Sequence, residues 1–336
     1  MAKKNEFRFV NYTQKRVILR TETKGHPKLQ KEIMPKPVYH IPALLPQTLE
    51  ALKISADGIY IDATLGGGGH SRAIVECLGN SGHLYSLDQD SDAIGHAFHD
   101  ERFTAVHGNF RYLENYADYY GISGKVDGIL ADLGVSFHHF DDATRGFSVR
   151  ADGPLDMRMN PSAERTAADI VASSSVDELT HLFKIYGELK QARHLAEALV
   201  SARVNEPVTT TGRLVAVASR FINPAREKKE LAQIFQALRI AVNGEMEALE
   251  QFLHQTVNVL CSGGRLAIIT YHSLEDRMVK NFMRTGRLDG EVEKDFFGRS
   301  SSPLKPLVSK PIVPDNDEIA RNPRSRSAKL RVAEKI

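Results

Sequence analysis

The chain has 336 residues, 42% of them hydrophobic and 26% charged, which is typical of a folded protein with one large or two moderate cores. No apolar run approaches the roughly 20 residues that a membrane-spanning helix needs, and no apolar segment near the start suggests a signal peptide. We therefore expect a cytoplasmic protein that does not enter a membrane.

The net charge of +2 conceals an asymmetry along the chain. Residues 1–36 carry ten Lys and Arg against three Glu, and residues 321–336 carry six against one, so the segment between them is acidic. Because Lys and Arg neutralise phosphates, two basic ends favour contact with a nucleic acid. Solvated tails that keep the protein soluble explain the pattern equally well.

The first 38 residues are basic and interrupted by prolines, which predicts a disordered extension. Alternating apolar residues around Phe7 and Phe9 also fit a hairpin. Organised sequence begins at Tyr39, and leucines then recur at helical spacing between Leu44 and Leu52.

Residues 58–71 read G-I-Y-I-D-A-T-L-G-G-G-G-H-S. Residues 59–61 predict a short buried strand, and residues 71–79 predict a helix. The four glycines between them tolerate positive φ angles and let the backbone approach a ligand closely. Nucleotide, dinucleotide and S-adenosylmethionine sites all use such loops, so the motif alone does not choose among them.

Three further strands are predicted, at 82–87, 103–107 and 126–131. Asp88 ends the first of them, about 20 residues after the glycine loop, where a doubly wound fold places a carboxylate on a ribose diol. Phe110 follows the second strand, and Asp132 follows the third. Ligands of open parallel sheets lie outside the carboxyl ends of the strands. Together with Asp62, these residues therefore predict one ligand pocket.

After Ser136 the sequence becomes mostly helical. Ser175-Val-Asp-Glu178 is a capping box that begins a helix ending at Gly187. Apolar spacing predicts further helices at 192–206, 214–221, 231–242 and 246–260. We interpret residues 138–227 as a helical domain for substrate recognition, inserted after the fourth strand.

The last part of the chain is expected to complete the sheet. Gly263 and Gly264 are expected to cap the preceding helix, and residues 265–270 predict a fifth strand. Residues 304–314 and 328–333 predict a closing antiparallel pair. The whole pattern predicts an α/β fold with a Rossmann-like sheet, built from residues 39–137 and 228–336.

Seven short stretches occur together along the chain. The most specific is Asp152-Gly-Pro-Leu-Asp-Met-Arg-Met159. The others are His40-x-Pro42-x-Leu44-Leu45, Asp62-x-Thr64-x-Gly66-x-Gly68-Gly69-His70-Ser71, Asp132-Leu-Gly-Val-Ser136, Arg145-Gly-Phe-Ser148, His272-Ser-Leu-Glu-Asp-Arg277 and Asn322-Pro-Arg-x-Arg326. Through these stretches the chain resembles the ribosomal RNA small subunit methyltransferase H family from about residue 39 to the end.

The resemblance implies a class I methyltransferase sheet with an inserted helical domain. It implies transfer of a methyl group from S-adenosyl-L-methionine to N4 of a cytidine in the decoding region of 16S rRNA. The implied partner is that RNA, within the small ribosomal subunit. The oligomeric state is left open.

The resemblance also implies a set of cofactor-binding residues, which correspond here to Gly68, Gly69, His70, Asp88, Phe110 and Asp132. A further family contact is a glutamine in Asp-Leu-Gly-Val-Ser-Ser-Pro-Gln, and it is His139 here. The segment before Phe235 departs from the family as well, and residues 1–36 lie outside its pattern.

Methyl transfer to a cytosine amine depends mainly on alignment, which contributes up to ~7–11 kcal/mol in well-oriented systems. A hydrogen-bond acceptor on N4 stabilises the positive charge that develops there. Asp132 is our first candidate for this acceptor, or for a contact to the adenine side of the cofactor. His139 is the second catalytic candidate, as a general base, and His138 is its alternative. Either histidine fits a loop contact to the cofactor as well.

A target base must leave its stack to reach a buried methyl group. Phe137, Phe140 and Phe147 are candidates to stack on it, and core packing is the alternative for each. The stretch that contains Asp152, Asp156 and Arg158 is expected to fold over the cofactor or target base, and an Asp156–Arg158 ion pair that fixes a loop is the alternative.

His272, Glu275 and Asp276 invite a metal-site interpretation. We predict no metal, because transfer from a sulfonium needs no Lewis acid and a cap formed by Ser273 with Asp276 explains the pattern. Two other classes of function stay open on the residues alone. An NAD-dependent oxidoreductase uses a similar glycine loop and carboxylate, and a non-catalytic ribosome-assembly factor keeps the fold to bind RNA.

Overall fold

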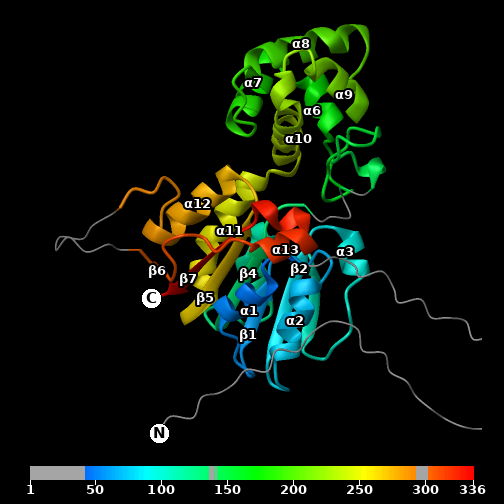
Figure 1. The fold of residues 1–336 in the computed structure, drawn as a ribbon. Coiled ribbons are helices and arrows are strands. Elements are labelled where there is room, and N and C mark those ends of the chain that lie inside the picture. The colour runs from blue at the N-terminus through cyan, green and yellow to red at the C-terminus, as the bar shows by residue number, and fades with distance from the viewer. Residues whose placement is uncertain (1–41, 136–139, 141, 293–301) are drawn as a thin grey trace, which may run out of the picture. The chain divides into compact units, whose positions relative to one another are not determined.

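Seven strands form one sheet in the order β3-β2-β1-β4-β5-β7-β6 (Figure 1). The first five strands in this order are parallel to one another, and β7 runs antiparallel to both β5 and β6. The strands are β1 Ile59–Asp62, β2 His83–Asp88, β3 Phe103–His107, β4 Val126–Asp132, β5 Leu260–Thr270, β6 Leu304–Pro306 and β7 Lys329–Lys335. The strand order reverses between β1 and β4, and this is where sheets of this kind bind ligands. The predicted Rossmann-like α/β fold is confirmed.

The computed structural model describes residues 42–135, 140, 142–292 and 302–336. The basic extension 1–38 and the candidate residues Phe137, His138 and His139 lie outside these ranges. The described residues all belong to one compact unit.

Neighbouring side chains on the central strands enter two different cores. Ile61 and Ile129 pack into the core on one face, whereas Tyr60 and Leu130 pack into the core on the other. Because both faces are covered, these strands read as continuous apolar runs. The first core contains side chains from α4 Leu113–Tyr119, α11 Glu245–Val259 and α12 Ser273–Thr285, and the second from α1 Leu45–Leu52 and α2 Gly69–Cys77.

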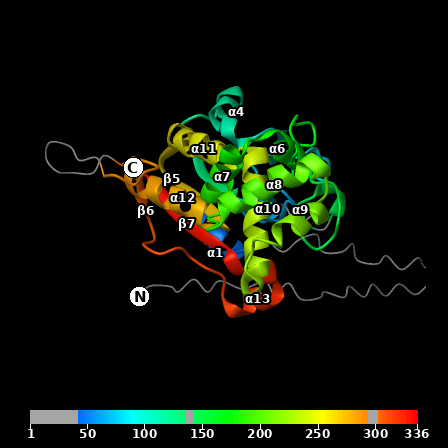
Figure 2. The same ribbon diagram turned by 90° about the horizontal axis from the view of Figure 1, so that it is seen from above.

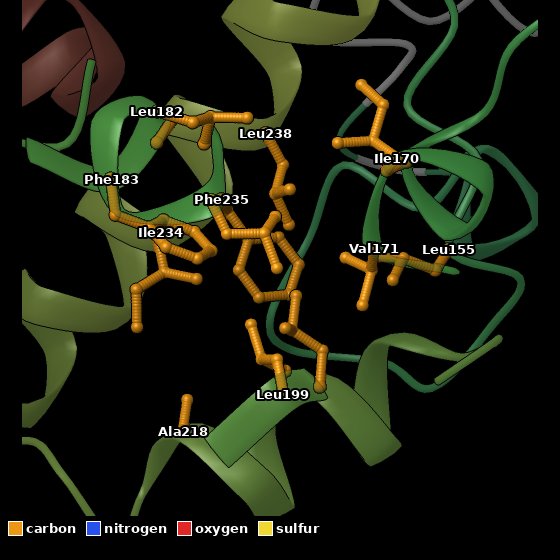
Figure 3. Packing of buried hydrophobic residues seen from close by; sticks show 14 of the residues in the cluster. Leu155, Ile170, Val171, Leu182, Phe183, Leu199, Ala218, Ile234, Phe235 and Leu238 are labelled. Carbon is orange, nitrogen blue, oxygen red and sulfur yellow. The ribbon is translucent and has the colours of Figure 1, made fainter. Parts of the chain in front are cut away.

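Five helices form a separate layer beyond the carboxyl ends of the strands (Figures 1 and 2). They are α6 Ala167–Ser173, α7 Val176–Ile185, α8 Ala192–Asn205, α9 Thr211–Ala218 and α10 Glu227–Asn243. Figure 3 shows their shared core, in which Phe235 and Leu238 of α10 lie among side chains of α6, α7 and α8. The predicted capping box is present, since the Ser175 hydroxyl accepts from the Glu178 amide. No helix in the described ranges is long and apolar enough to cross a membrane.

Helix α10 connects this layer directly to the sheet. Its last residue, Asn243, is separated from α11 only by Gly244, which has a φ of 56°. The layer and the sheet have distinct cores, but the division at residues 137 and 228 stays a prediction.

One predicted cap is wrong. Helix α11 ends at Val259, and Gly263 and Gly264 lie inside β5. The register between β4 and β5 shifts in this region, between Val126 and Gly128. A Cβ at Gly264 would stand 2.9 Å from the carbonyl oxygen of Val126, so glycine serves a close approach between strands there.

We expect Phe183→Ala to lower the free energy of unfolding by about 3–5 kcal/mol, because this fully buried ring lies at the centre of the helical layer. Denaturant titration measures the change. Ile185→Ala is the matched control, since this residue is on the same helix but 44% exposed, and we expect a change within about 0.5 kcal/mol. Equal losses in the two variants would contradict a core at Phe183.

Candidate functional site

A cavity of about 760 Å³ lies at the carboxyl ends of β1, β2, β4 and β5. The glycine loop, Asp88, Asp132 and Tyr271 line its sheet side. Helix α10 and residues 147–151 line the other side. The cavity therefore lies between the sheet and the helical layer, and both contribute to it.

The glycine loop is held by a buried carboxylate behind it. Asp62 accepts hydrogen bonds from the Ser71 hydroxyl at 2.6 Å and from the Thr64 amide at 3.1 Å. Burial raises the pKa of Asp62 to about 7, although the bond from Ser71 lowers it. Asp62 does not line the cavity, so this side chain shapes the loop from behind.

Glycines are required at particular points of this loop. Gly66 and Gly68 have φ angles of 48° and 73°, in the left-handed region that favours glycine. A Cβ at Gly69 would stand 3.0 Å from the ring of Pro42. Gly69 and His70 line the cavity, whereas Gly68 forms the cap at which α2 begins.

Asp88 lines the cavity and also braces the loop. Its Oδ2 accepts the Gly66 amide at 2.8 Å, and its Oδ1 accepts the Asp90 amide at 2.9 Å. Both oxygens of Asp88 therefore accept backbone amides while the side chain borders the cavity. The predicted ribose contact is compatible with this geometry.

Phe110 lines the cavity at the start of η1 Phe110–Tyr112, and its ring packs edge-on against Phe252 at 5.2 Å between centroids. Next to it, the Asn109 amide donates to Gln89 Oε1 at 2.7 Å, and the Gln89 amide donates to Met159 Sδ at 3.2 Å. This chain of contacts joins the ends of β2 and β3 to the loop that precedes the helical layer.

Asp132 stands at the end of β4 in contact with two other elements. The Tyr271 hydroxyl donates to its Oδ1 at 2.9 Å, and His70 Nδ1 lies 3.7 Å from its Oδ2. Burial raises the pKa of Asp132 to about 7, against the lowering effect of Tyr271. Burial and the neighbouring Asp132 raise the pKa of Tyr271 well above its usual range, so the phenol remains a donor.

A second charged group lies beside this pair. Arg239 on α10 donates through Nε and Nη2 to the two oxygens of Glu245, both at 2.8 Å. Glu275 accepts the Tyr271 amide at 2.9 Å. Burial opposes the ionisation of Glu275, but His272 and Arg239 hold its pKa below the usual value.

Ligand atoms of Glu245, His272 and Glu275 lie within 4.8 Å of one another, as in a metal site. His272 Nδ1 accepts the Glu275 amide at 3.4 Å and caps α12, and its Nε2 lies 3.0 Å from Glu275 Oε1 without hydrogen-bond geometry. The guanidinium of Arg239 already supplies a cation to Glu245. The absence of a metal stays a prediction, but the expected Ser273–Asp276 cap is wrong, because His272 and Glu275 form it.

Successive residues in the family-specific loop 152–159 have two different roles. Asp156 and Arg158 form a bidentate ion pair, with distances of 2.8 and 2.7 Å, and Arg158 also donates to the Ala163 carbonyl. Met157 and Met159 line the cavity, and Met157 has a positive φ of 63°. The ion pair therefore fixes the loop, while the methionines face the ligand space.

Arg145 ties this loop to the sheet. Its Nη2 donates to the Arg158 and Met159 carbonyls at 3.0 and 3.1 Å, and its Nη1 lies 3.7 Å from Asp90. Asp152 does not line the cavity and accepts the Gly212 amide at 2.7 Å. Its contact is thus with α9.

Most of the residues that the sequence singles out meet in this cavity. Gly69, His70, Asp88, Phe110 and Asp132 line it, and so do the stacking candidates Phe140 and Phe147. His139 is outside the described residues. The sequence reasoning missed the cavity-lining residues Gln89, Asn109, Arg239, Glu245 and Tyr271. Tyr271 had a signal, since it follows a strand as Asp88 and Asp132 do.

Comparison with known proteins identifies the family. The family model described as the MraW methylase family matches residues 37–336. A protein named ribosomal RNA small subunit methyltransferase H from Parabacteroides distasonis is 57% identical over 298 residues, which are 89% of this chain and 98% of that protein. A protein of the same name from Porphyromonas gingivalis is 54% identical over 304 residues, 89% of this chain and 97% of that protein.

Solved structures give only weak likenesses. TrmN from Thermus thermophilus is 11% identical, covers 87% of this chain and 48% of that one, and has a TM-score of 0.39. Geranyl diphosphate C-methyltransferase from Streptomyces coelicolor is 8% identical, covers 87% and 76%, and has a TM-score of 0.36.

Proposed function

The chain belongs to the MraW methylase family, and from this premise we propose that it transfers a methyl group from S-adenosyl-L-methionine to N4 of a cytidine in 16S rRNA. The cytidine that the resemblance implies is 1402 in the usual numbering, and we include that position in the proposal. Relatives that match 89% of this chain are named as methyltransferases of small-subunit ribosomal RNA, and the N4 of a cytidine is added from the motifs that this chain shares with that family.

One structural observation supports the proposal independently of the names of the relatives. A single cavity contains both the strand-end groups expected to hold the cofactor and a second group of polar residues around Tyr271 and Glu275. The glycine loop, Asp88 and Phe110 suit the amino acid, ribose and adenine of the cofactor. The space beside Tyr271 is then left for the base.

S-adenosylmethionine supplies an activated methyl group when it is bound. The protein then has to align the reacting groups and stabilise the charge that develops on them. Asp132 accepts a hydrogen bond from the N4 amine and stabilises the positive charge that develops on the amine. Tyr271 keeps this carboxylate oriented by donating to its other oxygen. The proton that N4 loses after transfer passes to Asp132 in this proposal.

Small ribosomal subunits isolated from a strain without the enzyme test the proposal. Incubation with methyl-labelled S-adenosylmethionine should incorporate one methyl group, and nuclease digestion with mass spectrometry should find it on N4 of the cytidine. Unlabelled subunits would favour a non-catalytic RNA-binding protein. Binding of NAD but not of S-adenosylmethionine would favour an oxidoreductase.

We expect the affinity for S-adenosylmethionine to fall about tenfold between pH 8 and pH 6. The ligand is a cation, and a pKa of Asp132 of about 7 means that acid neutralises the carboxylate that attracts it. Asp62, His70, Tyr271 and Glu275 also act on this group. Calorimetric titration at both pH values measures the change, and Asp132→Asn should remove most of it. An equally steep dependence in that variant would assign it to another group.

A further inference from the structure

Arg239 is positioned to contact a ligand in the cavity as well as to support the fold. The side chain is 12% exposed and lines the cavity from α10. Its Nε and Nη2 are engaged by Glu245, and within the described ranges its Nη1 makes no hydrogen bond. A guanidinium has five N–H donors in a rigid fork, so one edge of this one is held by Glu245 and donors remain for a ligand.

A series of neighbouring groups links Arg239 to the proposed reaction centre at Asp132. Arg239 binds Glu245, whose carboxylate lies within 4.8 Å of Glu275. Glu275 binds the amide of Tyr271 at 2.9 Å, and the hydroxyl of Tyr271 binds Asp132 at 2.9 Å. Arg239 and Asp132 therefore line the same cavity and are linked through Glu245, Glu275 and Tyr271, and we call these five residues the polar wall.

The polar wall offers the kinds of group that the Watson–Crick edge of cytosine can bind. That edge presents an amine donor, N4, followed by two adjacent acceptors, N3 and O2. A carboxylate at one end suits the amine, and an arginine fork suits two adjacent acceptors, as it does when it reads guanine O6 and N7. Uracil has a donor at N3, which would face the donors of Arg239, and a carbonyl where Asp132 needs a donor.

We propose that Arg239, fixed by Glu245, reads the N3 and O2 acceptors of the target cytosine and sets the base specificity of the enzyme. This inference rests on the proposed function. Donation to N3 and O2 draws electron density from the ring, so it favours recognition and does not speed the attack by N4. Loss of Arg239 should therefore raise KM for the RNA more than it lowers kcat.

The test combines a protein change with a change in the base. Small subunits are reconstituted with cytidine or 2-thiocytidine at the target, since sulfur is a weaker acceptor than oxygen. For the wild type, the thio base should lower kcat/KM by about fivefold, near the lower end of the roughly 5- to 150-fold range for a bidentate contact, because only one of the two acceptors is weakened. For Arg239→Gln, kcat/KM should already be low and the thio base should lower it little further.

Two controls separate recognition from folding and from cofactor binding. Arg331→Gln changes another buried, ion-paired arginine, which binds Asp276 and does not line the cavity, and it should respond to the thio base as the wild type does. Affinity for S-adenosylhomocysteine should be unchanged in Arg239→Gln. If that variant does not fold, Arg239→Lys keeps a cation beside Glu245 but removes the fork.

An equal effect of the thio base on wild type and Arg239 variants would overturn the inference. A loss of cofactor affinity that matches the loss of kcat/KM would assign Arg239 to the cofactor and overturn it as well. Failure of the proposed function is a different result, in which the wild type does not methylate the normal cytidine at all.

Discussion

Replacing Asp132 by Asn should lower the rate of methyl transfer by about 100-fold or more while the protein stays folded. The amide keeps the shape of the side chain and one acceptor oxygen, but it has no negative charge and takes no proton. Both the stabilisation of the charge on N4 and the removal of its proton then weaken. Single-turnover transfer to small subunits with saturating cofactor measures this step.

A control on the same strand makes the result specific. Asp127 lies toward the other end of β4, accepts the Ile59 amide at 2.8 Å and is not in the cavity. Asp127→Asn should therefore leave the single-turnover rate near that of the wild type. A wild-type rate in Asp132→Asn would mean that another group accepts the proton, and His139 would be the next residue to change.

The second large effect concerns cofactor binding. Asp88→Ala should lower the affinity for S-adenosylmethionine by roughly 100-fold, because it removes both the expected ribose contact and the acceptor of the Gly66 amide. Binding of the RNA should change much less. Calorimetry with the cofactor and filter binding with the subunit separate the two.

Asp100→Ala is the matched control for this variant. Its carboxylate pairs with Arg102 at 2.8 Å, near the start of β3 and away from the cavity. It should bind the cofactor normally. Equal losses of cofactor and RNA affinity in Asp88→Ala would show that Asp88 acts on the fold of the glycine loop as a whole.

The sheet was predictable because its signals are local. Apolar runs such as 59–61 and 126–131 mark buried strands, and the polar residue after each one marks its carboxyl end. The parallel arrangement then brings Asp88, Phe110 and Asp132 together without any knowledge of distances. The prediction of a helix cap at Gly263 was wrong because it used the same local signals. A pair of glycines gives the same sequence pattern after a helix and inside a bulged strand.

The other half of the site was not predictable in this way. Arg239 lies on a helix whose pattern reads as an ordinary apolar stripe, and its partner Glu245 belongs to the next helix. The two meet because Gly244 turns the chain between them, which no local pattern encodes. Tyr271 was visible as a strand-end residue, but its bond to Asp132 depends on the pairing of β4 with β5.

The junction at Asn243 and Gly244 has a consequence for chemical ageing. Asn-Gly pairs deamidate readily when the glycine nitrogen attacks the side-chain carbonyl carbon. In the fold, the Gly244 amide donates to the Ile240 carbonyl, and the Asn243 amide group donates to the Met157 and Arg239 carbonyls at 2.8 and 2.9 Å. These hydrogen bonds therefore protect Asn243 from deamidation in the folded protein. In an unfolded chain Asn243 can deamidate. The carboxylate that replaces its amide has no N–H groups, so it cannot donate to the Met157 carbonyl and hold Met157 against α10.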